Sequence, residues 1–235
     1  MKPIYILLFI SFFFPTELFS QQGFGGMVDR AKQAMTDLGN RSSRKPKPLN
    51  IQGTHYFNDN FEVATLDYFG TELNDKGFMR YNAFRDEIEM ASTTSQNESD
   101  LILMQSKDIV PVISGEKYLY LPYRLEDGRA QIGYLILLYE GKKNTVYIKK
   151  KKVFMEEVVA RTGLENPFPP RFVDEVKIYV SKNGDTPIPL RTKKKIVASF
   201  FKENSDKVRK FIKANRLKVS EPKDIIRVFE FADNL

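Results

Sequence analysis

Between residues 53 and 154 the chain is divided into strand-length segments by turns that are too short to hold a helix. Eight segments are rich in β-branched and aromatic residues, and Gly, Asn, Asp and Ser lie in the turns between them. They are residues 61–68, 77–83, 87–91, 101–104, 109–113, 117–123, 131–139 and 144–154. Because parallel strands need a long crossover connection, these strands are expected to pair antiparallel, as successive hairpins.

A further hairpin is predicted from residues 175–181 and 186–190, because Asn183 and Gly184 between them favour a tight turn. The Pro-rich stretch at 163–171 is expected to separate this strand pair from the earlier hairpins, since proline cannot donate to a strand ladder.

Two of the strands carry patterns that predict their surroundings. Ile88 and Met90 alternate with Glu87 and Glu89, which indicates a sheet with one face in water. Residues 132–139 are apolar almost throughout, which favours a central strand covered on both faces.

After Leu190 apolar residues recur at helical spacing, and Pro222 suits the first turn of the last helix. The predicted fold is α+β: an antiparallel, twisted sheet or partly open barrel of about eight to ten strands, with two or three C-terminal helices packed on it. The β-rich domain is assigned to residues 50–190 and the basic helical segment to residues 191–235.

The N-terminal residues 1–20 have the pattern of a secretory signal peptide. Lys2 precedes an apolar run at 4–14, and cleavage is expected after Ser20. This run is shorter than the roughly 20 residues that a membrane-spanning helix needs. Residues 21–49 are expected to form a short amphipathic helix and a basic linker. The mature protein is therefore expected to be exported, and to be periplasmic or associated with the outer membrane.

The residue types present exclude several kinds of chemistry. The chain has no cysteine, which rules out disulfides, thiol catalysis and thiolate metal sites. His55 is the single histidine, so no pair of imidazoles can hold a metal ion, and no G-x-S-x-G motif accompanies it. We therefore predict no catalytic residue, no cofactor and no metal ligand.

Positive charge is concentrated near the C-terminus. The formal net charge is +7, and residues 191–220 hold eleven basic residues against Glu203 and Asp206. Such a segment on an exported chain favours an anionic envelope component or an acidic protein surface as partner, with peripheral membrane contact and no nucleic acid. The predicted partner-binding residues in this segment are Lys193, Lys194, Lys195, Lys210 and Lys213.

A second run of lysines lies in the predicted strand 144–154. Lys149, Lys150, Lys151 and Lys152 would project from both faces of that strand. They are interpreted either as an extension of the partner-binding surface or as the guard of an edge strand against aggregation.

Several short segments resemble a family of uncharacterised exported proteins of Bacteroidota-type Gram-negative bacteria. The matching segments are Gly77-Phe78-Met79-Arg80-Tyr81-Asn82 with Asp86-Glu87-Ile88-Glu89, Gly133-Tyr134-Leu135, Glu140-Gly141-Lys142, Phe172-Val173-Asp174, residues 210–217 and Asp224-Ile225-Ile226. Residues 229–235 look like a variant of the family's aromatic, Asn-containing end. The resemblance covers most of the mature chain; it implies export from a cell with two membranes and supplies no catalytic residue.

The function predicted from the sequence is that of a non-enzymatic, exported binding or assembly factor of the cell envelope with a basic helical contact surface. One alternative is a periplasmic carrier that holds a lipid or a glycan in the interior of the sheet. A second alternative is a hydrolase built on the carboxylates of Asp67, Asp86, Glu87 and Glu89.

Overall fold

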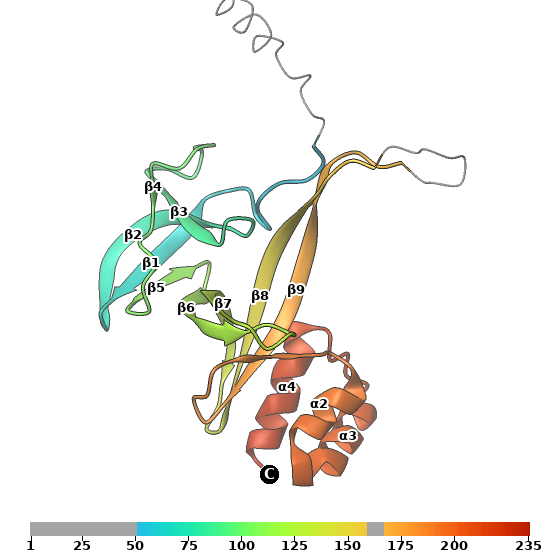
Figure 1. Ribbon diagram of the computed structural model, residues 1–235. Coiled ribbons are helices and arrows are strands. Elements are labelled where there is room, and N and C mark those ends of the chain that lie inside the picture. The colour runs from blue at the N-terminus through green and yellow to red at the C-terminus, as the bar shows by residue number, and fades with distance from the viewer. Residues whose placement is uncertain (1–50, 159–166) are drawn as a thin grey trace, which may run out of the picture. The chain divides into compact units, whose positions relative to one another are not determined.

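The predicted strands form one antiparallel sheet in the computed structural model, which describes residues 51–158 and 167–235 (Figure 1). Its ten described strands are β1 (Glu62–Tyr68), β2 (Thr71–Asn82), β3 (Glu87–Ala91), β4 (Leu101–Ile102), β5 (Ile109–Ile113), β6 (Glu116–Arg124), β7 (Ala130–Glu140), β8 (Asn144–Met155), β9 (Arg171–Lys182) and β10 (Ile188–Leu190). The α+β class is confirmed. The signal peptide expected at 1–20 and the helix and linker expected at 21–49 lie outside the described residues.

The order of the strands follows the chain closely. It runs β10-β9-β8-β7-β6-β5-β1-β2-β3-β4, so that β5 lies beside β1 on the side opposite β2. The short turns left no room for helical crossovers, and antiparallel pairing follows from that. At Asn183 and Gly184 the φ angles are 51° and 80°, both positive as a type I′ turn requires, and the predicted hairpin between β9 and β10 is confirmed.

The longest ladder joins β8 to β9, in register from Asn144 opposite Lys182 to Met155 opposite Arg171. The described part of the Pro-rich stretch, residues 167–170, is neither strand nor helix and lies between β8 and β9, as predicted. The two strands that it connects nevertheless pair with each other over their full length. Proline is excluded from the ladder but not from such a connection, so the pattern marks an interruption without telling which strands pair across it.

The middle of strand β7 is covered on both faces, as predicted, whereas Ile132 near its start is 54% exposed. Tyr134, Leu135 and Ile136 are each no more than 1% exposed. Tyr134 and Ile136 belong to the main core on one face, whereas Leu135 packs with Tyr123 and Tyr179 on the other. The middle of β7 is therefore a fixed support for side chains that approach it from either side.

The sheet is bent so that strands far apart in its order touch. The backbone N–H of Lys152 in β8 donates to the carbonyl of Ala83, at the turn between β2 and β3, at 3.0 Å. Four strands separate β2 from β8 in the order of the sheet. This contact brings the β2–β3 turn over β7 and β8, and both the charged clusters and the pocket described below lie near it.

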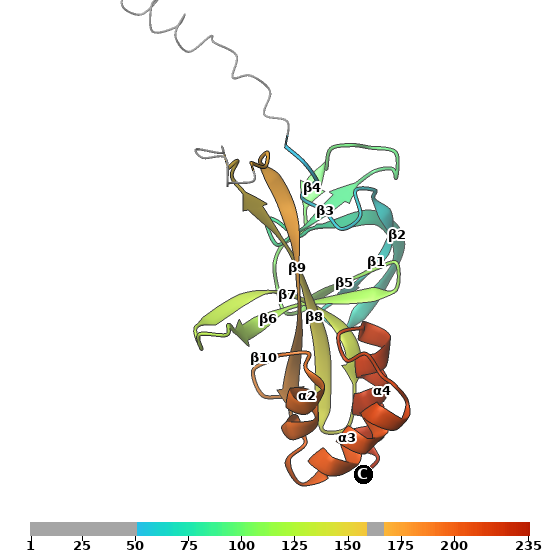
Figure 2. The same cartoon turned by 90° about the vertical axis from the view of Figure 1, so that its right-hand side faces the viewer.

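Three helices follow the sheet: α2 (Lys194–Phe200), α3 (Ser205–Ala214) and α4 (Pro222–Asp233), with a 3₁₀ turn at Lys202–Asn204. They gather beside one end of β8 and β9 (Figures 1 and 2). Their buried apolar residues share the main core with Val146 and Ile148 of β8. None of the described helices combines the length and the apolar character needed to cross a membrane.

The last turn of α4 is tied to the sheet by polar contacts. The Asp233 carboxylate accepts hydrogen bonds from the Tyr139 hydroxyl at 3.0 Å and from Asn144 Nδ2 at 2.7 Å. Tyr139 is the next-to-last residue of β7 and Asn144 begins β8, so one carboxylate connects α4 to both strands. The helical segment is therefore held by its apolar face and by its C-terminal end.

Candidate functional site

All eleven basic side chains of residues 191–218 are exposed, and we refer to them as the basic helical face. The face comprises Arg191, Lys193, Lys194, Lys195, Lys202, Lys207, Arg209, Lys210, Lys213, Arg216 and Lys218. Arg191 pairs with Glu126 and Arg209 pairs with Asp206; the other nine form no ion pair within the described part of the chain. On α3 the buried positions are Val208 and Ile212, which leaves Lys210 and Lys213 on the outer side of the helix.

The lysine run on β8 has a different environment. Strand β9 pairs with β8 along the whole run, whereas the ladder between β7 and β8 ends at Ile148. On that side Lys152 N–H donates to the carbonyl of Ala83 in the β2–β3 turn, so this edge of the run is partly covered by a turn and not by β7. Lys149, Lys150 and Lys152 contact carboxylates of Asp86, Glu116 and Asp174 at 2.6, 2.9 and 2.6 Å. Lys151 is exposed. The run therefore serves mostly to hold other strands and turns against β8, and the structure does not bring it together with the basic helical face.

Lys149 and Asp86 form a buried centre below the β2–β3 turn. Lys149 Nζ lies 2.6 Å from Asp86 Oδ2 and donates to the carbonyl of Tyr134 at 2.8 Å. The other oxygen of Asp86 accepts a hydrogen bond from the Tyr81 hydroxyl at 2.6 Å. Burial lowers the pKa of Lys149, and the Asp86 carboxylate opposes this shift. A Cβ at position 133 would overlap the Asp86 carboxylate, so Gly133 is what lets Asp86 approach β7.

A second buried ion pair fixes the other side of the β2–β3 hairpin. Arg80 and Glu89 face each other across the two strands, with 2.8 Å between Nε and Oε2, and their side chains are only 7% and 8% exposed. Glu89 also accepts hydrogen bonds from Tyr56 and Asn82. The prediction that Glu87 and Glu89 line a face in water is therefore wrong for Glu89, because Arg80 supplies the charge that makes its burial tolerable.

These contacts separate two of the four carboxylates proposed for a hydrolase, Asp86 and Glu89. Asp86 is engaged with Lys149 and Glu89 with Arg80, in two different hydrogen-bond networks. Asp67 lies on β1 opposite Glu72, near the start of β2. Arg80 lies near the other end of β2, and Asp86 lies in the turn that follows it. Within residues 51–158 and 167–235 no group of three His, Asp or Glu residues is arranged to hold a metal ion.

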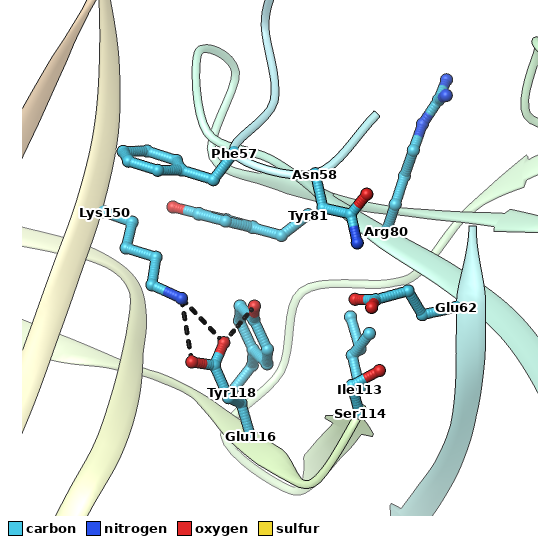
Figure 3. Close-up of a pocket in the computed structure, with 10 residues that line it drawn as sticks. All are labelled: Phe57, Asn58, Glu62, Arg80, Tyr81, Ile113, Ser114, Glu116, Tyr118 and Lys150. Carbon is cyan, nitrogen blue, oxygen red and sulfur yellow. Dashed lines mark hydrogen bonds and ion pairs between the residues drawn. The ribbon is translucent and has the colours of Figure 1, made fainter. Parts of the chain in front are cut away.

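A pocket of about 340 Å³ opens between the two parts of the bent sheet (Figure 3). It is lined by Phe57, Asn58, Glu62, Arg80, Tyr81, Ile113, Ser114, Glu116, Tyr118 and Lys150. These residues come from the loop before β1, from the β5–β6 turn and from strands β1, β2, β5, β6 and β8. The pocket therefore depends on the bend that brings β8 close to β2.

The two sides of this pocket differ in how their charges are balanced. On one side Lys150 Nζ lies 2.9 Å from both oxygens of Glu116, and the Tyr118 hydroxyl donates to the same carboxylate at 3.1 Å. On the other side the half-buried carboxylate of Glu62 points toward the cavity, and no described residue donates a hydrogen bond to it or pairs with it (Figure 3). Burial and the nearby charges of Glu116 and Glu62 raise the pKa of Tyr118.

Sequence reasoning missed this pocket, since none of its lining residues except Lys150 was singled out as a binding residue. Glu62 and Glu116 are 54 positions apart in the numbering and lie on strands that are not neighbours, and no motif links them. The one local signal was Glu62 itself, a carboxylate on the same face of its strand as Ala64 and Leu66, which pack into the core. Comparisons of the chain with models of protein families, with curated proteins and with solved structures found no match.

Proposed function

We propose that this protein is a non-enzymatic, exported factor of the cell envelope that binds an anionic membrane surface through its basic helical face. One observation carries the proposal: nine exposed basic side chains without an ion pair among the described residues stand on one helical segment. Unpaired surface lysines and arginines each add about 1 kcal/mol of attraction to an anionic lipid surface.

The composition of this face favours lipid headgroups over a protein partner. Stable protein interfaces are depleted in lysine at their centre and depend on buried aromatic or apolar anchors. Among the described residues of 191–235 only Leu235 is a large apolar side chain with high exposure, and the phenylalanines of the helices pack inward. A lysine-rich face without an exposed anchor suits diffuse electrostatic contact with phosphate groups.

The structure offers no comparable support for the two other functions considered. The pocket between the parts of the sheet is lined largely by polar and charged residues, which does not suit a lipid chain. The interior next to it is filled by tyrosines and aliphatic side chains. Two of the four carboxylates that a hydrolase would use, Asp86 and Glu89, are held in separate ion pairs.

Binding of the mature chain to vesicles tests the proposal. We expect co-sedimentation with phosphatidylcholine vesicles that contain phosphatidylglycerol, and loss of binding as salt is raised. Changing Lys193, Lys194, Lys195, Lys210 and Lys213 to Glu should weaken binding at least about a hundredfold.

A control variant distinguishes the effect of where the lysines lie from the effect of the change in net charge. It carries Glu at Lys107, Lys117, Lys142, Lys143 and Lys182, which are equally exposed but lie outside the basic helical face. This variant should keep most of the vesicle binding. Equal losses in the two variants, or capture of an acidic protein without any binding to anionic vesicles, would contradict the proposed membrane contact.

A further inference from the structure

The pocket of Figure 3 contains a charge that the protein itself does not balance. Glu116 is neutralised by Lys150, and Arg80 is neutralised by Glu89, which lies outside the lining. Glu62 is left as the one uncompensated charge among the lining residues. A half-buried carboxylate is stabilised most by a cation, so the pocket as a whole attracts a positively charged group.

Aromatic and polar groups surround this carboxylate. The rings of Phe57 and Tyr118 form part of the wall (Figure 3). Tyr118 is only 5% exposed, and Lys152 Nζ already lies 4.7 Å from the centroid of the Phe57 ring, so the exposed part of Phe57 is the aromatic surface that a ligand ring can contact. Asn58 uses its side-chain oxygen to accept the backbone N–H of Asn60 at 3.1 Å, and its Nδ2 donates to no described residue. The Ser114 hydroxyl and the Glu116–Lys150 pair add further partners for hydroxyl groups.

From this arrangement we infer that the pocket binds an amino sugar, a small ring that carries hydroxyl groups and an ammonium group, with the ammonium group on Glu62. A neutral sugar would use the same aromatic surface and hydrogen-bonding groups but would leave the Glu62 charge unbalanced. A linear diamine would satisfy Glu62 but would make no use of Asn58 and the Glu116–Lys150 pair. This site is independent of the basic helical face.

Glucosamine and glucose form a matched pair of probes, because they differ only in the amine at one ring carbon. Binding to the mature chain is measured by calorimetry near neutral pH, where the amine is protonated to a large extent. We expect glucosamine to bind about tenfold more tightly than glucose, the factor that a hydrogen bond to a charged group contributes. Raising the pH past the titration of the amine should remove the difference.

Glu62→Gln is the decisive variant, since it keeps the shape of the side chain and removes its charge. It should bind glucosamine and glucose equally. Glu140→Gln removes an exposed carboxylate at the end of β7 and should keep the preference for glucosamine. Unfolding curves of both variants confirm that the fold is kept, and Glu62→Asp, which keeps the charge, should retain a reduced preference.

Three results would overturn the inference: no binding of glucosamine to the intact chain, equal binding of glucosamine and glucose, or a preference that survives Glu62→Gln. The variant with five lysines of the basic helical face changed to Glu should bind glucosamine as the unchanged protein does. Failure of vesicle binding and failure of sugar binding are thus separate outcomes.

Discussion

The two lysine-rich segments of the chain differ in what surrounds them, although their compositions are alike. On β8, Lys149 and Lys152 are buried and each contacts a carboxylate from another part of the fold. On the helices, Lys210 and Lys213 are exposed and lie opposite the buried side of α3. The run on β8 has β9 at one edge and the β2–β3 turn beside the other, whereas a helix docked on a sheet keeps one side in water. The strand lysines therefore stabilise the fold, and the helical lysines remain available to a partner.

The largest loss of stability is expected where a substitution would leave a buried charge without its partner. Glu89→Gln leaves the Arg80 guanidinium in a site that is 7% exposed, without a negative charge at 2.8 Å. Breaking a buried pair in this way costs about 3–5 kcal/mol. Denaturant unfolding of the variant should show this loss in the free energy of unfolding.

Glu98→Gln, which removes a carboxylate in the loop at the other end of the Arg80 network, serves as the control and should change stability by less than about 0.5 kcal/mol. A loss below about 1 kcal/mol for Glu89→Gln would mean that Tyr56 and Asn82 hold the site without the charge.

Two lysines of β8 allow a buried, ion-paired lysine to be compared with an exposed one on a single strand. Lys149→Met removes the cation beside Asp86 and the donor to the Tyr134 carbonyl, and should cost about 1–3 kcal/mol. Lys151→Met, two positions along β8, alters an exposed side chain and should change stability by less than about 0.5 kcal/mol. Equal effects of the two substitutions, measured in the same unfolding experiment, would contradict the role assigned to the buried centre.

Much of the fold could be predicted because its signals are local. Turn residues and β-branched runs located β3 and β5 at their observed bounds, and the Asn183-Gly184 turn fixed the last hairpin. The pairing of β8 with β9 could not be read in the same way, because no short turn joins these two strands. Local patterns predict which residues form strands. The folded structure is needed to show which strands that are distant in sequence pair with each other.

The charged residues show even more clearly that local sequence patterns do not predict contacts between distant residues. Glu89 alternates with apolar residues, which predicts exposure, and only its cross-strand position opposite Arg80 reveals a buried pair. Asp86 meets Lys149, a residue 63 positions later, because the bent sheet carries the β2–β3 turn onto β8. The pocket beside Glu62 follows from the same bend. Its residues are remote in sequence, so no spacing rule could have assembled them.

The smallest expected change in stability concerns the contact between the sheet and the last helix. Burial and the hydrogen bond to Asp233 raise the pKa of Tyr139 to about 12. An unfolded tyrosine releases its proton near pH 10. Between these values the native state holds a proton that the unfolded state has lost, so Tyr139 contributes stability that is complete below about pH 10 and disappears as the pH rises toward 12.

Tyr139→Phe should therefore reduce the steepness with which the free energy of unfolding falls between pH 10 and 12, and cost about 1 kcal/mol at neutral pH. Part of the slope should remain, because burial also raises the pKa values of Tyr81 and Tyr118. Tyr68→Phe, at an exposed position on β1, should leave the slope unchanged. If both variants showed the slope of the unchanged protein, the Tyr139–Asp233 contact would contribute nothing to docking of α4, and Asn144 would be the polar partner of Asp233 that remains.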